Sequence, residues 1–176
     1  MGATRGCLIP LTLANLLEAE LAVSYVVSRS RGRIAVMPIS KELTIRLEDR
    51  PGTLGKCCRS LAQGAVNILA FQAYEREGQS LIRMVVDDPA RAKELLDADR
   101  IYYTEAEVAQ ITIPHHPGEL ARVASQLGEA YININYAYCG TDPASQMPLV
   151  IFGVTDVARA VRLLDRLPKE NVIKTA

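Results

Sequence analysis

The feature that most constrains the fold of this chain is an internal repeat. Pro51 and Pro117 are 66 residues apart, each begins a PGxL turn, and the same offset aligns Asn67 with Asn133. Further along, the offset becomes 68 because the second copy has two extra residues in CGTDPASQMP, and ARAKELLD then aligns with ARAVRLLD. A match this long and in register indicates a tandem duplication, so the fold must be built from two similar units.

Each copy carries the same order of expected elements. LTIRLE (43–48) and AQITIP (109–114) alternate apolar and polar residues, as half-buried strands do. After the Pro-Gly turn we expect an amphipathic helix, a two-stranded hairpin, and a second helix capped by Asp88 or Asp156. A short last strand is expected near RIYYTE and near NVIKT. The unit is βαββαβ, so we predict an α+β fold of two tandem ferredoxin-like units, with antiparallel sheets and helices on one face.

The repeat also sets the expected domains. We place an N-terminal extension at 1–40, a first domain at 41–107 and a second domain at 108–176. The extension contains CLIPLTLANLLEAELAVSYVV, whose polar residues argue against a membrane span and against a secretory signal. It forms either an amphipathic helix or a poorly ordered segment. Met37 is an alternative start, and we expect a chain beginning there to fold.

Composition excludes some classes of partner. Lys and Arg number 20, as do Asp and Glu, so no basic field exists to hold a nucleic acid. An RNA-recognition module has the same strand order but needs aromatic residues on its central strands, and the expected strands carry almost none. The four cysteines form no CxxC pair, which is typical of a reduced, cytoplasmic protein.

The cysteines and histidines do not indicate catalytic chemistry. Cys57 and Cys58 align with Val123 and Ala124, so we interpret them, and Cys139 by its own alignment, as structural residues. His115 and His116 are the only histidines, with no evident third metal ligand and no recognisable nucleophile beside them. We therefore predict no catalytic residue, metal or cofactor. Solvated turn residues and ligand contacts remain the two alternatives for these histidines.

The Pro-Gly turn itself is suited to contact a ligand. Proline fixes its own backbone angle, and glycine lets another group approach closely. The helix that follows begins with unpaired N–H groups, which suit a carboxylate. Asn67 and Asn133 offer both donors and an acceptor, although turn residues at a helix end would look the same.

These motifs together resemble the ACT domain family. The resemblance rests on DRPGTLGKCCRSLAQGAVNILAF and HHPGELARVASQLGEAYININYAY, and on VVDDPARAKELL and GVTDVARAVRLL. It covers about residues 41–170 and is similar to stand-alone tandem ACT proteins without a catalytic domain. The resemblance implies modules that bind amino acids, regulate metabolic enzymes, and pair side by side with ligand at the interface between modules.

By position, the resemblance implies two sets of ligand contacts. The first is Asp49, Arg50, Pro51, Gly52, Thr53, Leu54, Asn67 and Ile68, and the second is His115, His116, Gly118, Glu119, Leu120, Asn133 and Ile134. Arg50 makes the first turn the better anchor for a carboxylate, whereas Glu119 would repel one at the second turn. The two sites are therefore expected to differ in what they recognise.

The sequence thus predicts a cytoplasmic, non-catalytic regulatory module that binds an amino acid or a similar small molecule. We expect a homodimer that acts on a metabolic enzyme or regulator, with no nucleic acid or membrane as partner. The alternative is a structural or protein-interaction module that binds no ligand.

Overall fold

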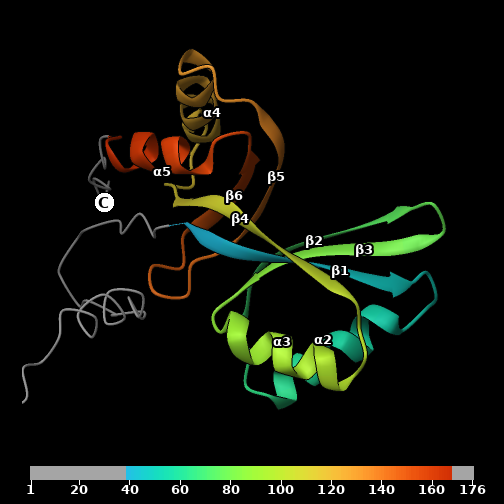
Figure 1. The fold of residues 1–176 in the computed structure, drawn as a ribbon. Coiled ribbons are helices and arrows are strands. Elements are labelled where there is room, and N and C mark those ends of the chain that lie inside the picture. The colour runs from blue at the N-terminus through green and yellow to red at the C-terminus, as the bar shows by residue number, and fades with distance from the viewer. Residues whose placement is uncertain (1–38, 168–176) are drawn as a thin grey trace, which may run out of the picture. The chain divides into compact units, whose positions relative to one another are not determined.

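The computed structural model describes residues 39–167, which belong to one compact unit of the chain. The strands are β1 (Ser40–Glu48), β2 (Ile68–Arg76), β3 (Gln79–Val86), β4 (Tyr103–Thr112), β5 (Ile134–Thr141) and β6 (Pro148–Val154). The helices are α2 (Thr53–Gln63), α3 (Pro89–Ala98), α4 (Glu119–Glu129) and α5 (Val157–Asp165) (Figure 1). The expected last strand near NVIKT and most of the N-terminal extension lie outside the described residues.

The first repeat has the predicted ferredoxin-like strand order. β4 pairs with β1, β1 with β3, and β3 with β2, and all of these pairs are antiparallel. The second helix of each repeat begins at the predicted cap: Asp88 accepts a hydrogen bond from the Arg91 amide, and Asp156 accepts one from the Arg159 amide, both at 2.9 Å. The predicted α+β fold class of two tandem ferredoxin-like units is therefore confirmed.

One long strand replaces two predicted strands at the junction of the repeats. The sequence predicts a strand near RIYYTE and a separate strand at 109–114, but β4 runs unbroken from Tyr103 to Thr112. Its first part pairs with β1 and its second part, from Ala109, pairs with β6. No glycine or proline lies within this segment, so nothing ends the strand. The prediction of two strands is wrong here, and the expected boundary between the domains falls inside a strand that both repeats share.

The two expected sheets are joined into one. The strand order is β1-β3-β2-β5-β6-β4, and the pairing of β4 with β1 closes the sheet into a barrel. β2 and β5 meet at a single residue pair, Ala70 with Gly140. A Cβ on Gly140 would lie 1.9 Å from the carbonyl oxygen of Leu69, so only glycine allows the strands to come this close.

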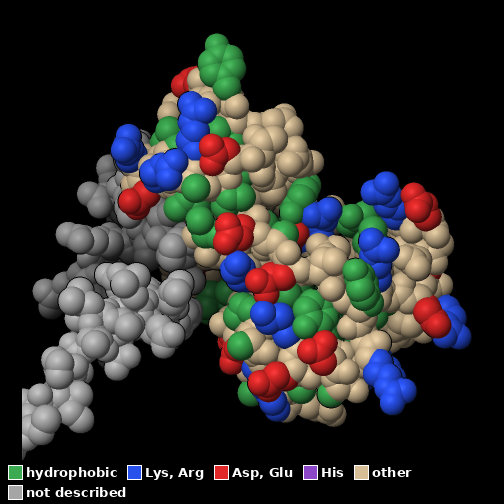
Figure 2. All heavy atoms as spheres, in the orientation of Figure 1, with side chains coloured by type: hydrophobic (Ala, Val, Ile, Leu, Met, Phe, Trp, Pro, Cys, Tyr) green, Lys and Arg blue, Asp and Glu red, His purple; other side chains and the backbone are tan. Residues whose placement is uncertain are grey.

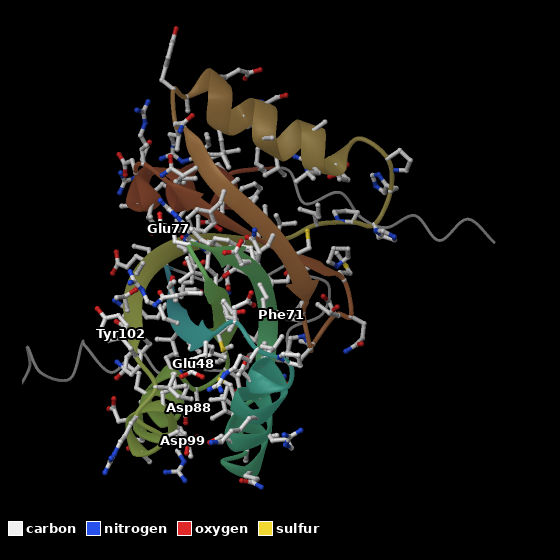
Figure 3. The ribbon with its side chains drawn as sticks, turned by 90° about the vertical axis from the view of Figure 1, so that its right-hand side faces the viewer. Glu48, Phe71, Glu77, Asp88, Asp99 and Tyr102 are labelled. Carbon is white, nitrogen blue, oxygen red and sulfur yellow. The ribbon has the colours of Figure 1, made fainter. Side chains whose placement is uncertain are left out.

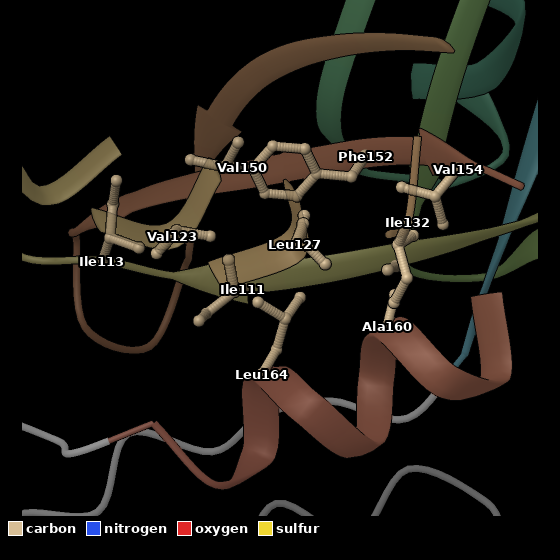
Figure 4. Close-up of a cluster of buried hydrophobic side chains, with 11 residues drawn as sticks. Ile111, Ile113, Val123, Leu127, Ile132, Val150, Phe152, Val154, Ala160 and Leu164 are labelled. Atoms are coloured by element: carbon tan, nitrogen blue, oxygen red, sulfur yellow. The ribbon is translucent and has the colours of Figure 1, made fainter. Parts of the chain in front are cut away.

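Three buried clusters fill the two faces of this sheet. In the first repeat, α2 and α3 pack on β1 and β3, and the cluster includes Leu43, Leu61 and Leu96. In the second repeat, residues of α4 and α5 pack on β4 and β6 around Phe152 (Figure 4). The third cluster lies on the opposite sheet face and combines residues of both repeats: Leu69, Ala70, Val85, Val108, Tyr138, Leu149 and Ile151. The inner face of the barrel is thus the interface between the repeats.

Charges of both signs are mixed on the face of the molecule seen in Figure 2. On the face seen in Figure 2, Lys and Arg side chains alternate with Asp and Glu over both repeats. This mixture agrees with the zero net charge of the sequence. Within residues 39–167, no helix is long and apolar enough to cross a membrane.

Candidate functional site

The first Pro-Gly turn connects β1 to α2 through a left-handed backbone conformation that suits glycine. Gly52 has a φ of +91°, which side-chain-bearing residues rarely adopt, and it is the N-cap of α2. Among the described residues no side chain caps this helix; the Thr53 amide donates to the Arg50 carbonyl oxygen at 3.3 Å, and the other amides of the first turn retain donor capacity. A Cβ built on Gly52 meets nothing within 4 Å, so the space beside the turn is open. The backbone angle, and not crowding within the chain, is what requires glycine here.

Thr53 and Asp49 fix the shape of the first turn. The Thr53 hydroxyl lies 2.9 Å from the carbonyl oxygen of Arg50 and 3.1 Å from that of Glu48. The Ser80 hydroxyl donates to the Asp49 carboxylate at 2.8 Å, which ties the turn to the β2–β3 hairpin. The predicted contact residue Asp49 therefore already has a structural partner.

Arg50 is also paired. Its guanidinium contacts the Glu48 carboxylate, and the two side chains are 70% and 67% exposed. Exposed ion pairs contribute little free energy, so a ligand carboxylate can compete with Glu48 for Arg50. The predicted role of Arg50 as a carboxylate anchor thus requires an exchange of partners.

An open depression lies beside this turn. It is lined by Arg46, Leu47, Glu48, Asp49, Arg50, Gly78, Gln79 and Tyr102. Figure 3 shows Glu48 and Tyr102 on one face of the first repeat, and the Arg46 guanidinium lies 5.6 Å from the centre of the Tyr102 ring. Sequence reasoning identified Asp49 and Arg50 but missed Arg46, Gln79 and Tyr102. These come from the preceding strand, the hairpin and the segment before β4, and only tertiary structure brings them together.

The second turn repeats the backbone but not the side chains. Gly118 has a φ of +96° and again no atom within 4 Å of a built Cβ. Glu119 takes the place of Thr53, and its carboxylate is buried. Arg122 donates to it from Nε at 3.1 Å and from Nη2 at 2.7 Å, and His116 Nδ1 lies 3.7 Å away. Arg122 therefore offsets the negative charge that was expected to repel a ligand carboxylate.

The two asparagines lie away from the turns of their own repeats. Asn67 follows the C-terminal end of α2, about 16 Å along an 11-residue helix from the turn at its start. The backbone N–H of Asn67 donates to the Asp87 carboxylate at 2.8 Å, and the backbone carbonyl of Asn67 accepts from the backbone N–H of Asp87. The Asn133 side chain donates to Asn135 at 2.9 Å. Neither asparagine completes the turn that precedes it in sequence.

The apolar predicted contacts differ in exposure. Leu54, Ile68 and Ile134 pack against the cores of their repeats, whereas Leu120 is exposed at the start of α4. Pro51 and both histidines are exposed as well. The exposed residues at the two turns are therefore accessible to a ligand, whereas Leu54, Ile68 and Ile134 contribute to the packing of the core.

The cysteines agree only in part with a structural role. Cys57 is buried in the core of the first repeat, and burial raises the pKa of its thiol to about 11. Burial raises the pKa of Cys58 as well. Cys139 is exposed, which corrects its assignment to the core. It lies on β5, whose only ladder pair with β2 among residues 39–167 is at Gly140. Among the described residues, no cluster of three His, Cys, Asp or Glu side chains is arranged to hold a metal ion.

The sequence model of a family described as the ACT domain pair matches residues 37–171. No curated protein matches the sequence. A protein from Bacteroides thetaiotaomicron has a similar crystal structure, with a TM-score of 0.66, 24% identity, and coverage of 74% of this chain and 90% of the other. The ligand-free regulatory subunit of aspartate kinase from Thermus thermophilus matches with a TM-score of 0.54, 16% identity, and coverage of 76% and 94%.

Proposed function

Because the chain belongs to the family of ACT domain pairs, we propose that it is a non-catalytic regulatory module that binds an amino acid or a similar small molecule. The aspartate kinase chain from Thermus thermophilus that shares its fold is a regulatory subunit. By analogy, binding would act on a metabolic enzyme or regulator through association, because a ligand shifts an equilibrium only between states that it binds differently. We place this activity in the cytoplasm.

The observation that carries the proposal is the open depression beside the first turn. Both signs of charge meet there: Arg46 and Arg50 are cationic, and Glu48 and Asp49 are anionic. A free amino acid has an ammonium and a carboxylate a few ångströms apart and needs both kinds of partner. The uncapped amides of α2 and the Arg50 guanidinium would bind the carboxylate. Glu48, released from Arg50, would accept from the ammonium.

The second turn would form a different site. Glu119 is held by Arg122, and the imidazoles of His115 and His116 are the exposed polar side chains at this turn, although His116 also lies 3.7 Å from Glu119. Their imidazoles can donate or accept a hydrogen bond. We propose that Asn67, Ile68, Asn133 and Ile134 contribute from a neighbouring ACT unit, since each lies away from the turn of its own repeat.

A homodimer would supply such a neighbour. β2 pairs with β5 only at Ala70, so its edge beyond that residue has no partner strand within residues 39–167. Phe71 follows this pairing point on β2 and is exposed (Figure 3). An open strand edge with an exposed aromatic residue favours pairing with another chain. The dimer interface would then lie along β2, the strand that Asn67 directly precedes.

A specific observation favours the alternative, a structural or protein-interaction module that binds no ligand. The polar side chains of both turns already have partners in the chain: Asp49 binds Ser80, Arg50 binds Glu48, and Glu119 binds Arg122. A site of this kind has to exchange partners before it binds anything. The free energy of that exchange would weaken binding.

A thermal-shift screen against the amino acids separates the two functions. A ligand at 100 times its dissociation constant stabilises the folded state by about 2.7 kcal/mol, which raises the melting temperature by several degrees. We expect such a shift for one amino acid or a small chemical group of them. If no amino acid shifts the melting temperature at millimolar concentration, the structural alternative is favoured.

A further inference from the structure

The interface between the repeats contains a buried charge. Glu42 lies on β1 with its side chain on the inner face of the barrel, and its exposed fraction is 0%. Its carboxylate accepts from Tyr138 Oη at 2.7 Å, from Tyr136 Oη at 2.8 Å and from Arg83 Nη1 at 3.2 Å. Three donors to one carboxylate, one of them charged, offset much of the cost of removing it from water.

Arg83 is held from several directions. It lies on β3, and its guanidinium carbon is 3.7 Å from the centre of the Tyr136 ring, a cation–π contact. Its Nε and Nη2 atoms are each 3.4 Å from the Tyr74 hydroxyl. Gly153 makes room for the Tyr136 ring, because a Cβ there would lie 2.1 Å from the ring. The Arg83 guanidinium and the Tyr136 ring therefore hold each other in position.

The contacts of this cluster cross from one repeat to the other. Glu42 and Arg83 belong to the first repeat, whereas Tyr136 and Tyr138 are on β5 of the second. A small rotation or slide between the repeats would move the hydroxyls away while the carboxylate stayed buried. A buried charge that loses a partner costs several kcal/mol, far more than an apolar contact that slides. The cluster thus penalises every arrangement of the repeats except this one.

The duplication shows that the cluster exists on one side only. In the repeat alignment Glu42 corresponds to Val108, Arg83 to Ile151, and Tyr136 to Ala70. Those three apolar residues lie in the third buried cluster. Tyr138 corresponds to Gln72, whose side-chain oxygen is buried, so the four symmetry-related residues are three apolar residues and one neutral amide, with no charged group among them. The two repeats cannot exchange places and keep the same contacts.

We propose that Glu42, Arg83, Tyr136 and Tyr138 form a latch that fixes the orientation of the second repeat relative to the first. Buried ionic groups add little net stability compared with apolar packing, but they can specify one arrangement. The latch makes the duplicated pair one asymmetric body. This inference does not depend on ligand binding.

A double-mutant cycle tests the energetic part of the proposal. Urea unfolding is measured for the full chain and for Glu42→Gln, Tyr138→Phe and the double variant. We expect the effects to be non-additive, with a coupling of about fivefold or more in the unfolding equilibrium constant. The control cycle uses Lys93→Gln and Glu105→Gln, whose exposed ion pair at 2.7 Å should show much smaller coupling. If Glu42→Gln does not fold, the cycle is run with Tyr136→Phe and Tyr138→Phe.

A distance measurement tests the geometric part. Spin labels are placed on exposed positions of the two repeats, Arg59→Cys on α2 and Ser125→Cys on α4. Three native cysteines are replaced by the residues aligned with them in the other repeat, Cys57→Val, Cys58→Ala and Cys139→Ala, and Cys7, which lies outside the repeats, is replaced by serine. Labelled protein is diluted with unlabelled protein so that only distances within one chain are read. We expect a narrow distance distribution, which Tyr138→Phe or Glu42→Gln broadens.

The control for lost stability is Leu61→Ala in the core of the first repeat, which should lower the melting temperature without broadening the distribution. An additive cycle would overturn the proposal. A distribution in the latch variants as narrow as in the parent would overturn it as well.

Discussion

At the scale of single residues, the two turns differ most in the residue after the glycine. The Thr53 hydroxyl holds the first turn by bonding its carbonyl groups, whereas Glu119 is buried against Arg122. Both solutions keep the glycine backbone in the same conformation. The duplication thus preserved the backbone of the turn and let its side-chain chemistry diverge, which is why we expect the two turns to recognise different groups.

The cysteines provide a prediction about reactivity. The thiolate is the form that alkylates, so burial and a raised pKa should protect Cys57, whereas Cys139 is exposed. We expect iodoacetamide to modify Cys139 at least about tenfold faster than Cys57 in the folded protein. Mass spectrometry of peptides from a timed reaction measures both rates. Urea provides the control, because both thiols should react alike once the chain unfolds. Equal rates in the folded protein would contradict the buried position of Cys57.

The latch tyrosines provide a prediction about alkaline pH. Burial and then the Glu42 carboxylate raise the pKa of Tyr136 to about 12 and raise that of Tyr138 still further from its usual value of 10.0. The folded protein holds these protons more tightly than the unfolded chain does. Their contribution to stability is therefore fully present below pH 10, the usual value, and is lost as the pH rises toward 12 and beyond.

Urea unfolding at a series of pH values between about 9 and about 11 measures the start of this loss, because the range crosses the pKa that tyrosine has in the unfolded chain. Tyr138→Phe removes one titrating group, so its free energy of unfolding should depend less steeply on pH than that of the parent. Tyr131→Phe is the matched control, because Tyr131 is 94% exposed. The assignment fails if Tyr138→Phe and Tyr131→Phe show the same pH dependence.

At the scale of elements, the shared strand and the strand crossing join the repeats. β4 completes the sheet of the first repeat and begins that of the second. β2 and β5 approach at one point, where Gly140 faces Ala70. These two connections close the sheet into a barrel and place the latch inside it.

Gly140→Ala should therefore destabilise the protein. The new methyl group would meet the Leu69 carbonyl and the Ala70 backbone, and neither can move without shifting β2. We expect a loss of about 3 kcal/mol in the free energy of unfolding. Gly128→Ala is the opposite control, because that glycine lies in α4 with open space around it and alanine favours a helix by about 1 kcal/mol. Urea unfolding of both variants checks the pair; equal stability of Gly140→Ala and the parent would argue against the close crossing.

Much of the fold could be predicted because the repeat and the caps act locally. The Pro-Gly turns, the capping Asp88 and Asp156, and the apolar face of each helix are encoded within a few residues. The repeat boundary predicts two separate strands where the structure has the single strand β4, because the boundary of a duplication need not interrupt a strand. The depression is only half predicted, since Arg46 lies on β1 and Tyr102 lies in the segment before β4, far from the turn in sequence. The burial of Glu42 could not be predicted from the sequence, because a glutamate at the start of a strand is usually exposed.

At the scale of the whole molecule, the chain is a duplicated unit that has become asymmetric. One side of the interface carries the ionic latch, and the symmetry-related residues Val108, Ile151, Ala70 and Gln72 carry no charge. One turn opens on a depression of mixed charge, and the other presents two histidines. In such a pair the first turn can serve a ligand while the second diverges, so the proposed regulator would use its two sites differently.

The most direct test of the proposed function is a calorimetric titration of Gly52→Val and Gly118→Val with the amino acid that most raises the melting temperature of the parent. Both glycines have positive φ and open space around them, so the two substitutions impose similar backbone strain and each places a side chain beside one turn. With both variants folded, we predict that Gly118→Val keeps the parent's affinity at the first site. Gly52→Val should lose that binding. Undiminished binding by folded Gly52→Val would contradict the assignment of the ligand to the first turn.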